Sequence, residues 1–361
     1  MTDAVTDGVT PAVPARLAFA GSGRITGAHG LAARDLPGVE VIAVASRHPE
    51  HARERAEQMG ARPCTYDELP AGADVVVVAT PPALHAAHVL HALAQGAAVI
   101  VEKPLCTTLA EADALVAAAG PTGARVAYAE NLVFAPIVVR AIELTAALGQ
   151  LRHLEVRALS NRPTWGDFLT AQWGGGVLFD LGVHPLALAV LLAEASATGE
   201  GSPPPQLTSI RARLEGADDI EVDDYAEVDL TFDSGLEARV VASWRHDDPQ
   251  WDLQAASDVG VVRAELLPAL LLERDGVAVT IPAGHPEGDI PQIAQFGYQG
   301  QLETFLSDFA AGRAPTMNVT FGRRMLEIVC AAADSASQGG VEVALPFTGP
   351  RDRNPLQLWR G

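Results

Sequence analysis

The sequence predicts an α/β protein in two parts, a parallel sheet followed by a mixed or antiparallel one. Up to about residue 130, apolar runs alternate with helical segments of about 10–15 residues, which is typical of βαβ units. Longer and partly alternating runs follow, as in a sheet with helices on one face. The 361 residues suffice for two domains, at roughly 150 residues each. We expect a loose tail at 1–14, one domain at 15–130 and a second at 131–361.

The first half contains apolar runs that are each followed by a helical segment. The run at 74–80 (DVVVVAT) is continuous rather than alternating, which indicates a strand buried on both faces. Glu111 lies three residues after Thr108, the spacing of a capping box at a helix N-terminus. Strands are predicted at 16–20, 39–45, 74–80 and 98–101, and helices at 25–34, 49–59, 84–95 and after Thr108.

The second half reads as a sheet with helices on one face. Asp233-Ser234-Gly235 separates two of its runs as a hairpin turn would. Residues 197–206, rich in glycine and proline, are expected to form a flexible insertion. Strands are predicted at 151–159, 207–214, 225–232, 236–243, 252–257, 260–265 and 278–281, and helices at 299–311 and 321–337.

Charge and cysteine content exclude several classes of protein. With 45 acidic against 25 basic residues, the formal net charge is −20, so neither nucleic acid nor an anionic membrane surface is an expected partner. The three cysteines are far apart, with no CxxC pair and no Cys/His cluster. We therefore expect no disulfide framework and no metal site, and a reducing compartment fits.

The sequence gives no sign of export or membrane insertion. No basic segment precedes an apolar stretch at the N-terminus, as a signal peptide requires. The longest apolar runs, such as 75–79, fall far short of the roughly 18 residues of a membrane span. These observations predict a soluble cytoplasmic protein.

Lysine occurs once in the chain, at Lys103, among 25 basic residues. A mutational bias toward arginine explains the other 24, so the remaining lysine marks a position where a guanidinium, which cannot lose its proton, would not serve. It lies in Glu102-Lys103-Pro104, after the strand at 98–101, and ligands of open α/β sheets bind at the carboxyl ends of the strands. The alternative is an exposed lysine with no chemical role.

A glycine-rich turn follows the first predicted strand and opens the first helix. In a dinucleotide fold such a turn lets the backbone approach the pyrophosphate at the helix N-terminus. Thr26 takes the place of the usual third glycine and Gly27 follows it, so the pattern is GxGxxxG, and a plain turn is the alternative. The candidate cofactor-binding residues here are Gly21, Ser22, Gly23, Arg24 and Ile25.

Two further strand ends carry candidate cofactor contacts. Thr80, Pro81 and His85 form a turn after the third strand, beside the expected cofactor. The second strand ends in Ser46-Arg47, where an NAD site usually has an acid and an NADP site a small polar residue and an arginine. We predict NADP, with NAD possible and an ordinary exposed arginine as the alternative.

A glycine triplet precedes Asp180 and His184, whose spacing of four would place both on one helix face. Pro185 complicates this geometry, because proline disfavours a helical residue before it. A surface Asp–His pair is the alternative. Trp165 and Trp173 are candidates to stack on a sugar face, although aromatic residues more often belong to the core.

These motifs, in this order, resemble the glucose–fructose oxidoreductase/inositol dehydrogenase (Gfo/Idh/MocA) family. The resemblance covers nearly the whole chain past residue 15. It rests on GxGxI…H (Gly21 to His29), TPPxxH (Thr80 to His85), EKP (Glu102 to Pro104) and GGGxLxDxGxH (Gly174 to His184), and it extends through DDYAEVDLTFDSG, YQGQLETFLSDFAAGRAP and VEVALP.

The resemblance implies a Rossmann dinucleotide-binding domain followed by an α/β domain whose open, mostly antiparallel sheet often serves as an oligomer interface. It therefore implies a homodimer or homotetramer. It further implies a Lys-Asp-His site at Lys103, Asp180 and His184, a frequently cis Lys103–Pro104 bond, and Asn131 facing nicotinamide or substrate. The histidine version of this site is similar to that of inositol dehydrogenases, most of which favour NAD.

The resulting hypothesis is an NAD(P)-dependent oxidoreductase that transfers hydride between nicotinamide and a carbinol or keto carbon of a sugar, keto-sugar or cyclitol. His184 would exchange the hydroxyl proton, Asp180 would orient the imidazole, and Lys103 would hold the substrate oxygen. A lysine base at pH 7 would need its pKa lowered by about 3 units, roughly 4 kcal/mol, whereas histidine ordinarily titrates near this pH.

Several alternatives stay open: an inositol-type NAD dehydrogenase, glycoside cleavage through transient oxidation, action on dihydrodiols or imines, and a non-catalytic NADP(H) sensor.

Overall fold

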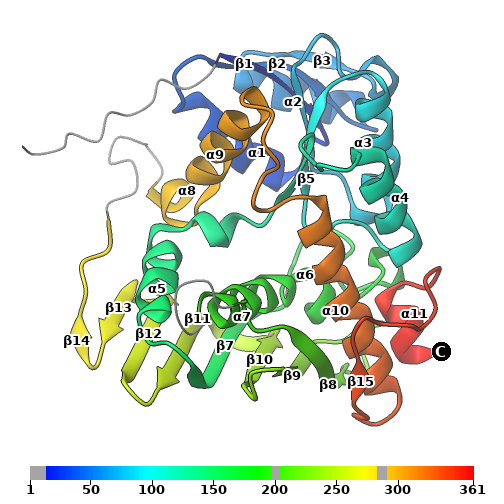
Figure 1. Ribbon diagram of the computed structural model, residues 1–361. Helices are drawn as coiled ribbons and strands as arrows, with labels where there is room; N and C mark the ends of the chain where they lie inside the picture. Colours follow the sequence, from blue (N-terminus) through cyan, green and yellow to red (C-terminus); the bar gives the residue numbers. More distant parts are fainter. Residues whose placement is uncertain (1–13, 197–202, 283–290) are drawn as a thin grey trace, which may run out of the picture.

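The structure is a computed structural model that describes residues 14–196, 203–282 and 291–361. The predicted tail at 1–14 lies almost wholly outside the described residues, as does most of the predicted insertion at 197–206. Figure 1 shows two sheets at opposite ends of the molecule with helices between and around them.

The first sheet has six parallel strands in the order β3-β2-β1-β4-β5-β6, the doubly wound arrangement of dinucleotide-binding domains. All four residues of β4 are buried, which explains its continuous apolar run. The strands are β1 Ala15–Ala20, β2 Val39–Ala45, β3 Arg62–Cys64, β4 Val75–Val78, β5 Ala98–Glu102 and β6 Val126–Ala129. The predicted parallel sheet is confirmed.

Helices connect these strands close to the predicted positions. The capping box at Thr108 is confirmed: its Oγ1 accepts the Glu111 amide at 3.2 Å, and a Glu111 carboxylate oxygen accepts the Thr108 amide at 3.0 Å. The helices are α1 Arg24–Arg34, α2 Pro49–Met59, α3 His85–Ala94 and α4 Leu109–Ala119, with a short 3₁₀ helix, η2 Pro82–Leu84, before α3.

The second sheet has nine strands in the order β14-β13-β12-β11-β7-β10-β9-β8-β15. Every neighbouring pair is antiparallel except β7 and β10, which run parallel. The prediction of an open, mostly antiparallel sheet is therefore confirmed. Its strands are β7 Leu151–Asn161, β8 Leu207–Glu215, β9 Tyr225–Phe232, β10 Glu237–Ser243, β11 Arg245–Ser257, β12 Gly260–Leu267, β13 Leu271–Arg274, β14 Val277–Ala278 and β15 Val343–Ala344.

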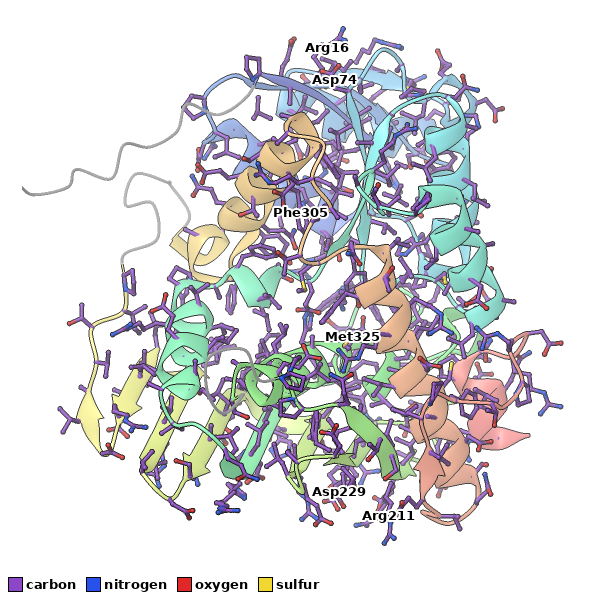
Figure 2. All side chains as sticks on the ribbon, viewed as in Figure 1. Arg16, Asp74, Arg211, Asp229, Phe305 and Met325 are labelled. Carbon is purple, nitrogen blue, oxygen red and sulfur yellow. The ribbon has the colours of Figure 1, made fainter. Side chains whose placement is uncertain are left out.

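The two faces of this sheet differ in polarity. Helices α5 (Pro136–Ala146) and α7 (Val183–Ala195) cover the face that looks toward the first sheet (Figure 1). The outer face carries charged side chains such as Arg211 and Asp229 (Figure 2). Many are paired across strands, as where Arg239 donates to Asp229 at 2.8 Å.

Strand ends in the second sheet depart from the predictions where pairing, rather than local pattern, decides. The strand predicted at 252–257 begins at Arg245, because the polar residue Arg245 pairs with Asn161 of β7. The strand β13 was not predicted, and the strand predicted at 278–281 is the two-residue β14. Short edge strands carry little periodic signal.

Helices from the end of the chain return to the first sheet. In α9 (Tyr298–Ala310), Leu302 and Phe305 are buried in one core cluster with Phe19 and Ile100 of the parallel sheet (Figure 2). The long helix α10 (Val319–Ser337) packs on α4 and β8, and α11 (Pro355–Arg360) packs on α10. The domain boundary at residue 130 stays a prediction. Helix α9 lies after that boundary in the sequence but packs into the core of the first sheet.

One apolar segment is longer than the sequence analysis expected for any apolar run in this chain. A window within Ala171–Ala195 has the length and composition of a membrane-spanning helix, yet 89% of it is buried inside the protein. The expectation that no run approaches this length was wrong, and burial shows that the segment, which ends in α7, belongs to the protein core. Apolar on all sides, α7 is enclosed by the second sheet, α5 and α10.

Candidate active site

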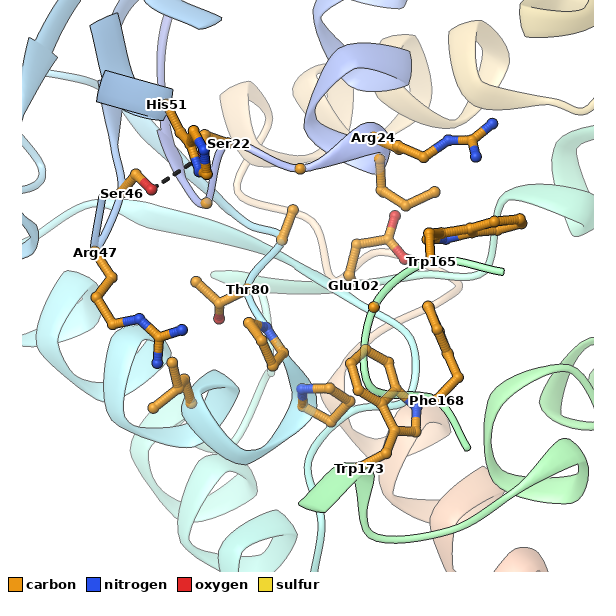
Figure 3. A pocket seen from close by; sticks show the side chains of 18 of the residues that line it. Ser22, Arg24, Ser46, Arg47, His51, Thr80, Glu102, Trp165, Phe168 and Trp173 are labelled. Carbon is orange, nitrogen blue, oxygen red and sulfur yellow. Dashed lines mark hydrogen bonds between the residues drawn. The ribbon is translucent and has the colours of Figure 1, made fainter. Parts of the chain in front are cut away.

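A cavity of about 530 Å³ lies at the carboxyl ends of β1, β2, β4 and β5 and is closed by the segment 165–173 of the second half (Figure 3). Its volume is in the usual range for small-ligand sites. The predicted site residues that line it are Gly21, Ser22, Gly23, Arg24, Ile25, Ser46, Arg47, Thr80, Pro81, Glu102, Lys103, Trp165, Trp173 and Asp180. Within the described chain, His85, Asn131 and His184 are not among its lining residues.

The glycine turn between β1 and α1 has the shape that a pyrophosphate requires. Gly21 has a φ of +116°, and a Cβ there would lie 2.4 Å from the carbonyl oxygen of Ala79, so only glycine fits. A Cβ on Gly23 would meet nothing within 4 Å, and α1 has no side-chain cap. The first amides of α1 are therefore open to an anion from the cavity side.

Gly27, which gives the turn its unusual GxGxxxG spacing, makes room for an arginine of the next helix. A Cβ on Gly27 would lie 2.8 Å from a terminal nitrogen of Arg55. The Nε of Arg55 donates to the carbonyl oxygen of Ser22 at 3.3 Å. Arg55 thus supports the turn from behind, a role that the sequence analysis missed because no local pattern links the two helices.

The end of β2 presents hydroxyl and cationic groups to the cavity. Ser22 Oγ donates to Ser46 Oγ at 3.0 Å, which ties the first two strand ends together (Figure 3). Arg47, His48 and His51 line the same end. Of the described residues that line the cavity, the carboxylates are Glu102 and Asp180, which belong to β5 and to the short helix α6 (Val177–Asp180) and not to this end.

His85, a predicted cofactor contact, connects two loops behind the cavity wall. It is buried, with Nε2 2.7 Å from the carbonyl oxygen of Thr80 and Nδ1 2.9 Å from that of Pro104. Burial lowers the pKa of His85, although the two carbonyls favour its charged form. Its place in the structure is to hold the turn after β4 against the loop after β5.

Glu102, at the end of β5, is a buried carboxylate with two partners. Its Oε1 lies 2.7 Å from Nε2 of His29, and its Oε2 accepts the Lys103 amide at 3.0 Å. Burial alone would raise its pKa, but His29 and Lys103 outweigh burial, so the pKa of Glu102 lies below its ordinary value. This carboxylate therefore stays ionised. It lies beside the end of the cavity that is lined by Lys103 and Asp180, which we call the reaction end.

Lys103 points at Asp180 across the reaction end of the cavity. Its Nζ donates to the carbonyl oxygen of Asp180 at 2.8 Å and to Oδ1 at 3.0 Å. Burial disfavours the ammonium, but Asp180 and Glu102 outweigh it and the pKa of Lys103 is raised. In this arrangement Lys103 is a hydrogen-bond donor to Asp180. The expected cis Lys103–Pro104 bond is confirmed.

The structure corrects the predicted pairing of Asp180 with His184. Helix α6 ends at Asp180 and α7 begins at Val183, so the two residues do not share one continuous helix. Asp180 binds Lys103, whereas Nδ1 of His184 lies 2.5 Å from Oε1 of Glu130. The break falls at 181–182, and both His184 and Pro185 lie in the first turn of α7, where a proline removes no helical hydrogen bond.

Glu130 is the site residue that the sequence analysis missed. Its side chain is fully buried, and Oε2 has no hydrogen-bond partner. Glu130 follows β6 as Glu102 ends β5, so a carboxylate at the carboxyl edge of the parallel sheet was the available signal. A buried carboxylate against one ring nitrogen fixes the orientation of an imidazole.

Asn131 and His184 are both buried and are not among the described residues that line the cavity. Both are 6% exposed. The Nδ2 of Asn131 donates to the carbonyl oxygen of Phe296 at 2.8 Å, and the His184 ring lies 5.9 Å from the ring of Trp251. The donor group of Asn131 thus already has a partner within the protein, and its contact with nicotinamide or substrate stays a prediction.

Aromatic side chains of the segment 165–173 form one wall of the cavity that Lys103 also lines. The guanidinium of Arg24 lies 4.3 Å from the ring centre of Trp165, and the rings of Phe168 and Trp173 are 4.2 Å apart (Figure 3). Trp165 is 49% exposed. Both tryptophans predicted to contact substrate therefore line the cavity, and Trp173 also packs against the main core.

Known proteins resemble the chain in sequence and in structure. It is 38% identical over 165 residues to the dTDP-3,4-didehydro-2,6-dideoxy-alpha-D-glucose 3-reductase of Streptomyces violaceoruber, covering 43% of this chain and 47% of that protein. It is 25% identical to the glucose-6-phosphate 3-dehydrogenase of Bacillus subtilis, covering 59% of this chain and 63% of that one. The chain thus spans less than two thirds of the length of these curated relatives.

A solved structure shows the same fold over nearly the whole chain. GenD2 from gentamicin A biosynthesis, solved in complex with NAD, superposes with a TM-score of 0.81 at 26% identity, covering 95% of this chain and 99% of that one. Residues 15–130 match the family described as oxidoreductase family, NAD-binding Rossmann fold, and residues 139–262 match the GFO/IDH/MocA C-terminal domain. With both of its parts matched in order, the chain belongs to the GFO/IDH/MocA oxidoreductase family.

Proposed function

We propose that this protein is an NADP(H)-dependent oxidoreductase that transfers hydride between nicotinamide and a carbinol or keto carbon of a sugar, keto-sugar or cyclitol. One observation carries the proposal: a single cavity extends from Ser46 and Arg47 to the Lys103–Asp180 pair and the aromatic wall. Relatives named as a sugar 3-reductase and a sugar-phosphate 3-dehydrogenase support the substrate class.

The residues present fit a dinucleotide. The open amides at the start of α1 would hold the pyrophosphate, and Gly21 lets the backbone approach it. When bound, the nicotinamide supplies the hydride acceptor or donor. All other steps fall to the side chains at the reaction end.

The end of β2 favours a 2′-phosphate over a free ribose hydroxyl. A 2′-phosphate would find the hydroxyl of Ser46 and the charge of Arg47, with His51 on the same wall. An NAD site would ordinarily place a carboxylate here to bind the ribose 2′-hydroxyl. GenD2 was solved with NAD, so NAD preference is the alternative that the binding experiment below addresses.

Two groups of residues share the proton chemistry: Lys103 is the hydrogen-bond donor, and His184 with Glu130 transfers the proton. Lys103, held by Asp180, donates a hydrogen bond to the substrate oxygen and stabilises negative charge on it. In the oxidative direction, Nε2 of His184, which does not itself line the cavity, would accept the hydroxyl proton while the C–H hydride passes to the bound nicotinamide and the carbonyl forms. Glu130 holds Nδ1 and stabilises the imidazolium. Reduction reverses each transfer.

The aromatic wall sets the kind of substrate. Trp165 and Trp173 line the same cavity as Lys103, and their apolar rings suit the C–H face of a sugar or cyclitol ring whose hydroxyls turn toward the charged side chains. The homo-oligomer and cytoplasmic location implied by the sequence stay predictions.

Fluorescence titration with NADPH and NADH, followed by turnover with polyols and keto-sugars, tests the proposal. Tighter binding of NADPH together with turnover supports it. Tighter binding of NADH would move the protein to the NAD-dependent, inositol-type reading and make Arg47 an ordinary surface cation. Binding of NADPH without turnover on any compound would favour the sensor, and binding of neither nucleotide would overturn the proposal.

A further inference from the structure

We propose that an acidic segment of the second half, residues 218–224 (DDIEVDD), is a positioning element for both walls of the reaction end. We call it the acidic strap. It links β8 to β9 and runs beside the segment 162–178. The role assigned to it rests on the proposed function, because it acts through Lys103 and through the aromatic wall.

Asp223 fastens the start of α6, the short helix that carries Asp180. Its Oδ1 accepts the amide of Gly176 at 2.9 Å and its Oδ2 accepts the amide of Leu178 at 2.8 Å. Its backbone carbonyl accepts the amide of Val177 at 2.8 Å. Three successive amides at the start of α6 thus donate hydrogen bonds to one residue, Asp223, which is 4% exposed.

The fit between the strap and α6 leaves no room for adjustment. A Cβ on Gly176 would lie 2.0 Å from the Asp223 carbonyl oxygen, so this last glycine of the triplet allows the close contact. Both the backbone carbonyl and the carboxylate of Asp180 bind Nζ of Lys103. A shift of α6 would therefore move both acceptors of the ammonium at once.

Other acids of the strap hold the aromatic wall. Glu221 accepts the Ala171 amide on its carboxylate at 2.6 Å and donates its own amide to the Leu169 carbonyl at 3.2 Å. Asp219 and the buried Asp224 both bind Arg162, at 2.7 and 2.9 Å. These bonds fix both ends of the loop that carries Trp165 and Phe168.

The chemistry of the strap depends on carboxylates. An ionised aspartate has two acceptor oxygens and no donor, so Asp223 satisfies two amides that point at it. An asparagine has one acceptor oxygen, and its NH₂ group would face an N–H donor. Substitution Asp223→Asn therefore changes charge and acceptor count while keeping shape.

Lysine-selective ¹⁵N labelling tests this inference without turnover, because Lys103 is the only lysine and gives one ammonium signal. In Asp223→Asn we expect that signal to shift and its exchange with solvent to rise by about 10- to 100-fold, the equivalent of one charge-assisted hydrogen bond. The matched control is Asp233→Asn, which removes a carboxylate acceptor from the Gln206 amide at the opposite end of β9 and should leave the signal unchanged.

Kinetics separate positioning from mere support of the fold. Asp223→Asn should lower kcat by about 10- to 100-fold, as expected for displaced catalytic groups, with little change in KM and none in the Kd of NADPH. Glu221→Ala, at an exposed position, should raise KM and leave the Lys103 signal unchanged, and it gives an outcome even if Asp223→Asn does not fold.

An unchanged Lys103 signal and unchanged kcat in folded Asp223→Asn would overturn the role of Asp223. An unchanged KM in Glu221→Ala would overturn the role of Glu221. If the wild-type protein turns over no compound, the proposed function fails, while the ammonium signal still decides whether the strap positions Lys103.

Discussion

The two ends of the cavity are built in different ways. At the cofactor end, Gly21 and Ser46 directly follow the neighbouring strands β1 and β2 of one sheet. The hydroxyl of Ser22, next to Gly21, binds that of Ser46. At the reaction end, Lys103, Asp180 and Glu130 come from segments far apart in the chain and are held by buried charges. One end relies on backbone shape and the other on ion pairs whose partners must be brought together by the fold.

This difference indicates how substitutions at each end of the cavity should affect cofactor binding and turnover. Exposed groups such as Arg47 act on a bound anion through water-screened charge, so their loss should weaken binding moderately. Buried pairs such as Glu130 with His184 lack that screening, and removing one partner leaves the other without compensation. Changes at the cofactor end should therefore alter affinity, and changes at the reaction end should alter rate and pH dependence.

The largest expected effect is that of His184→Ala. Loss of a positioned acid–base group should lower turnover by about 10²- to 10⁴-fold, with the Kd of NADPH unchanged because His184 lies outside the cofactor end. Steady-state kinetics and fluorescence titration measure the two quantities. His153→Ala, on the exposed outer face of β7, is the control, and full activity of His184→Ala would remove the histidine from the mechanism.

Next in size is a pH effect on stability at the reaction end. Burial raises the pKa of Asp223 to about 6, from 3.8, so between these values the folded protein holds a proton that the unfolded chain has released. The free energy of unfolding therefore falls as pH rises through this window, by up to about 3 kcal/mol. Above it, Asp223 is ionised and accepts both amides.

Urea unfolding of the wild type and of Asp223→Asn between pH 4 and pH 7 measures this effect. The asparagine variant cannot titrate at this position, so the stability of the wild type relative to the variant should decrease over the window. Parallel pH dependences of the two proteins would show that Asp223 does not titrate there.

Glu130→Gln tests the correction to the site. A glutamine can still accept a bond from His184 Nδ1 but brings no charge, so turnover should fall by about 10- to 100-fold, the equivalent of a charge-assisted hydrogen bond. The Lys103 ammonium signal should change less than in Asp180→Asn, because Glu130 acts on that ammonium through its charge and not through a hydrogen bond. Asp180→Asn should alter that signal, and the opposite assignment of the two effects would restore the original pairing of Asp180 with His184.

The smallest effect is expected at the cofactor end. Arg47→Ala should raise the Kd of NADPH by about tenfold, because an exposed charge contributes at the low end for charge-assisted contacts, and should leave NADH binding unchanged. Arg53→Ala, an exposed arginine of α2 that does not line the cavity, is the matched control. Equal weakening of both nucleotides would assign Arg47 to a contact other than the 2′-phosphate.

Much of the site was predictable because its residues belong to short sequence patterns that can be recognised without the structure. The lone Lys103, the glycine turn at Gly21 and the Ser46-Arg47 pair each follow a strand whose carboxyl end had to face the crevice, and all of them line the cavity. Glu130 follows a strand of only four residues, β6, that the sequence analysis had not identified. Its contact with His184 spans 54 positions, and no spacing rule reaches that far.

The sequence by itself determined the alternation of strands and helices, the parallel first sheet and the place of the cofactor end, because these follow from hydrophobic periodicity and turn chemistry within short windows. Only the tertiary structure decided which acid meets which base. Pairing among Lys103, Asp180, Glu130 and His184 depends on where α6 breaks and on where the strap from β8 to β9 lies. Burial then removes the solvent that would otherwise weaken those charges, so the fold sets both their partners and their strength.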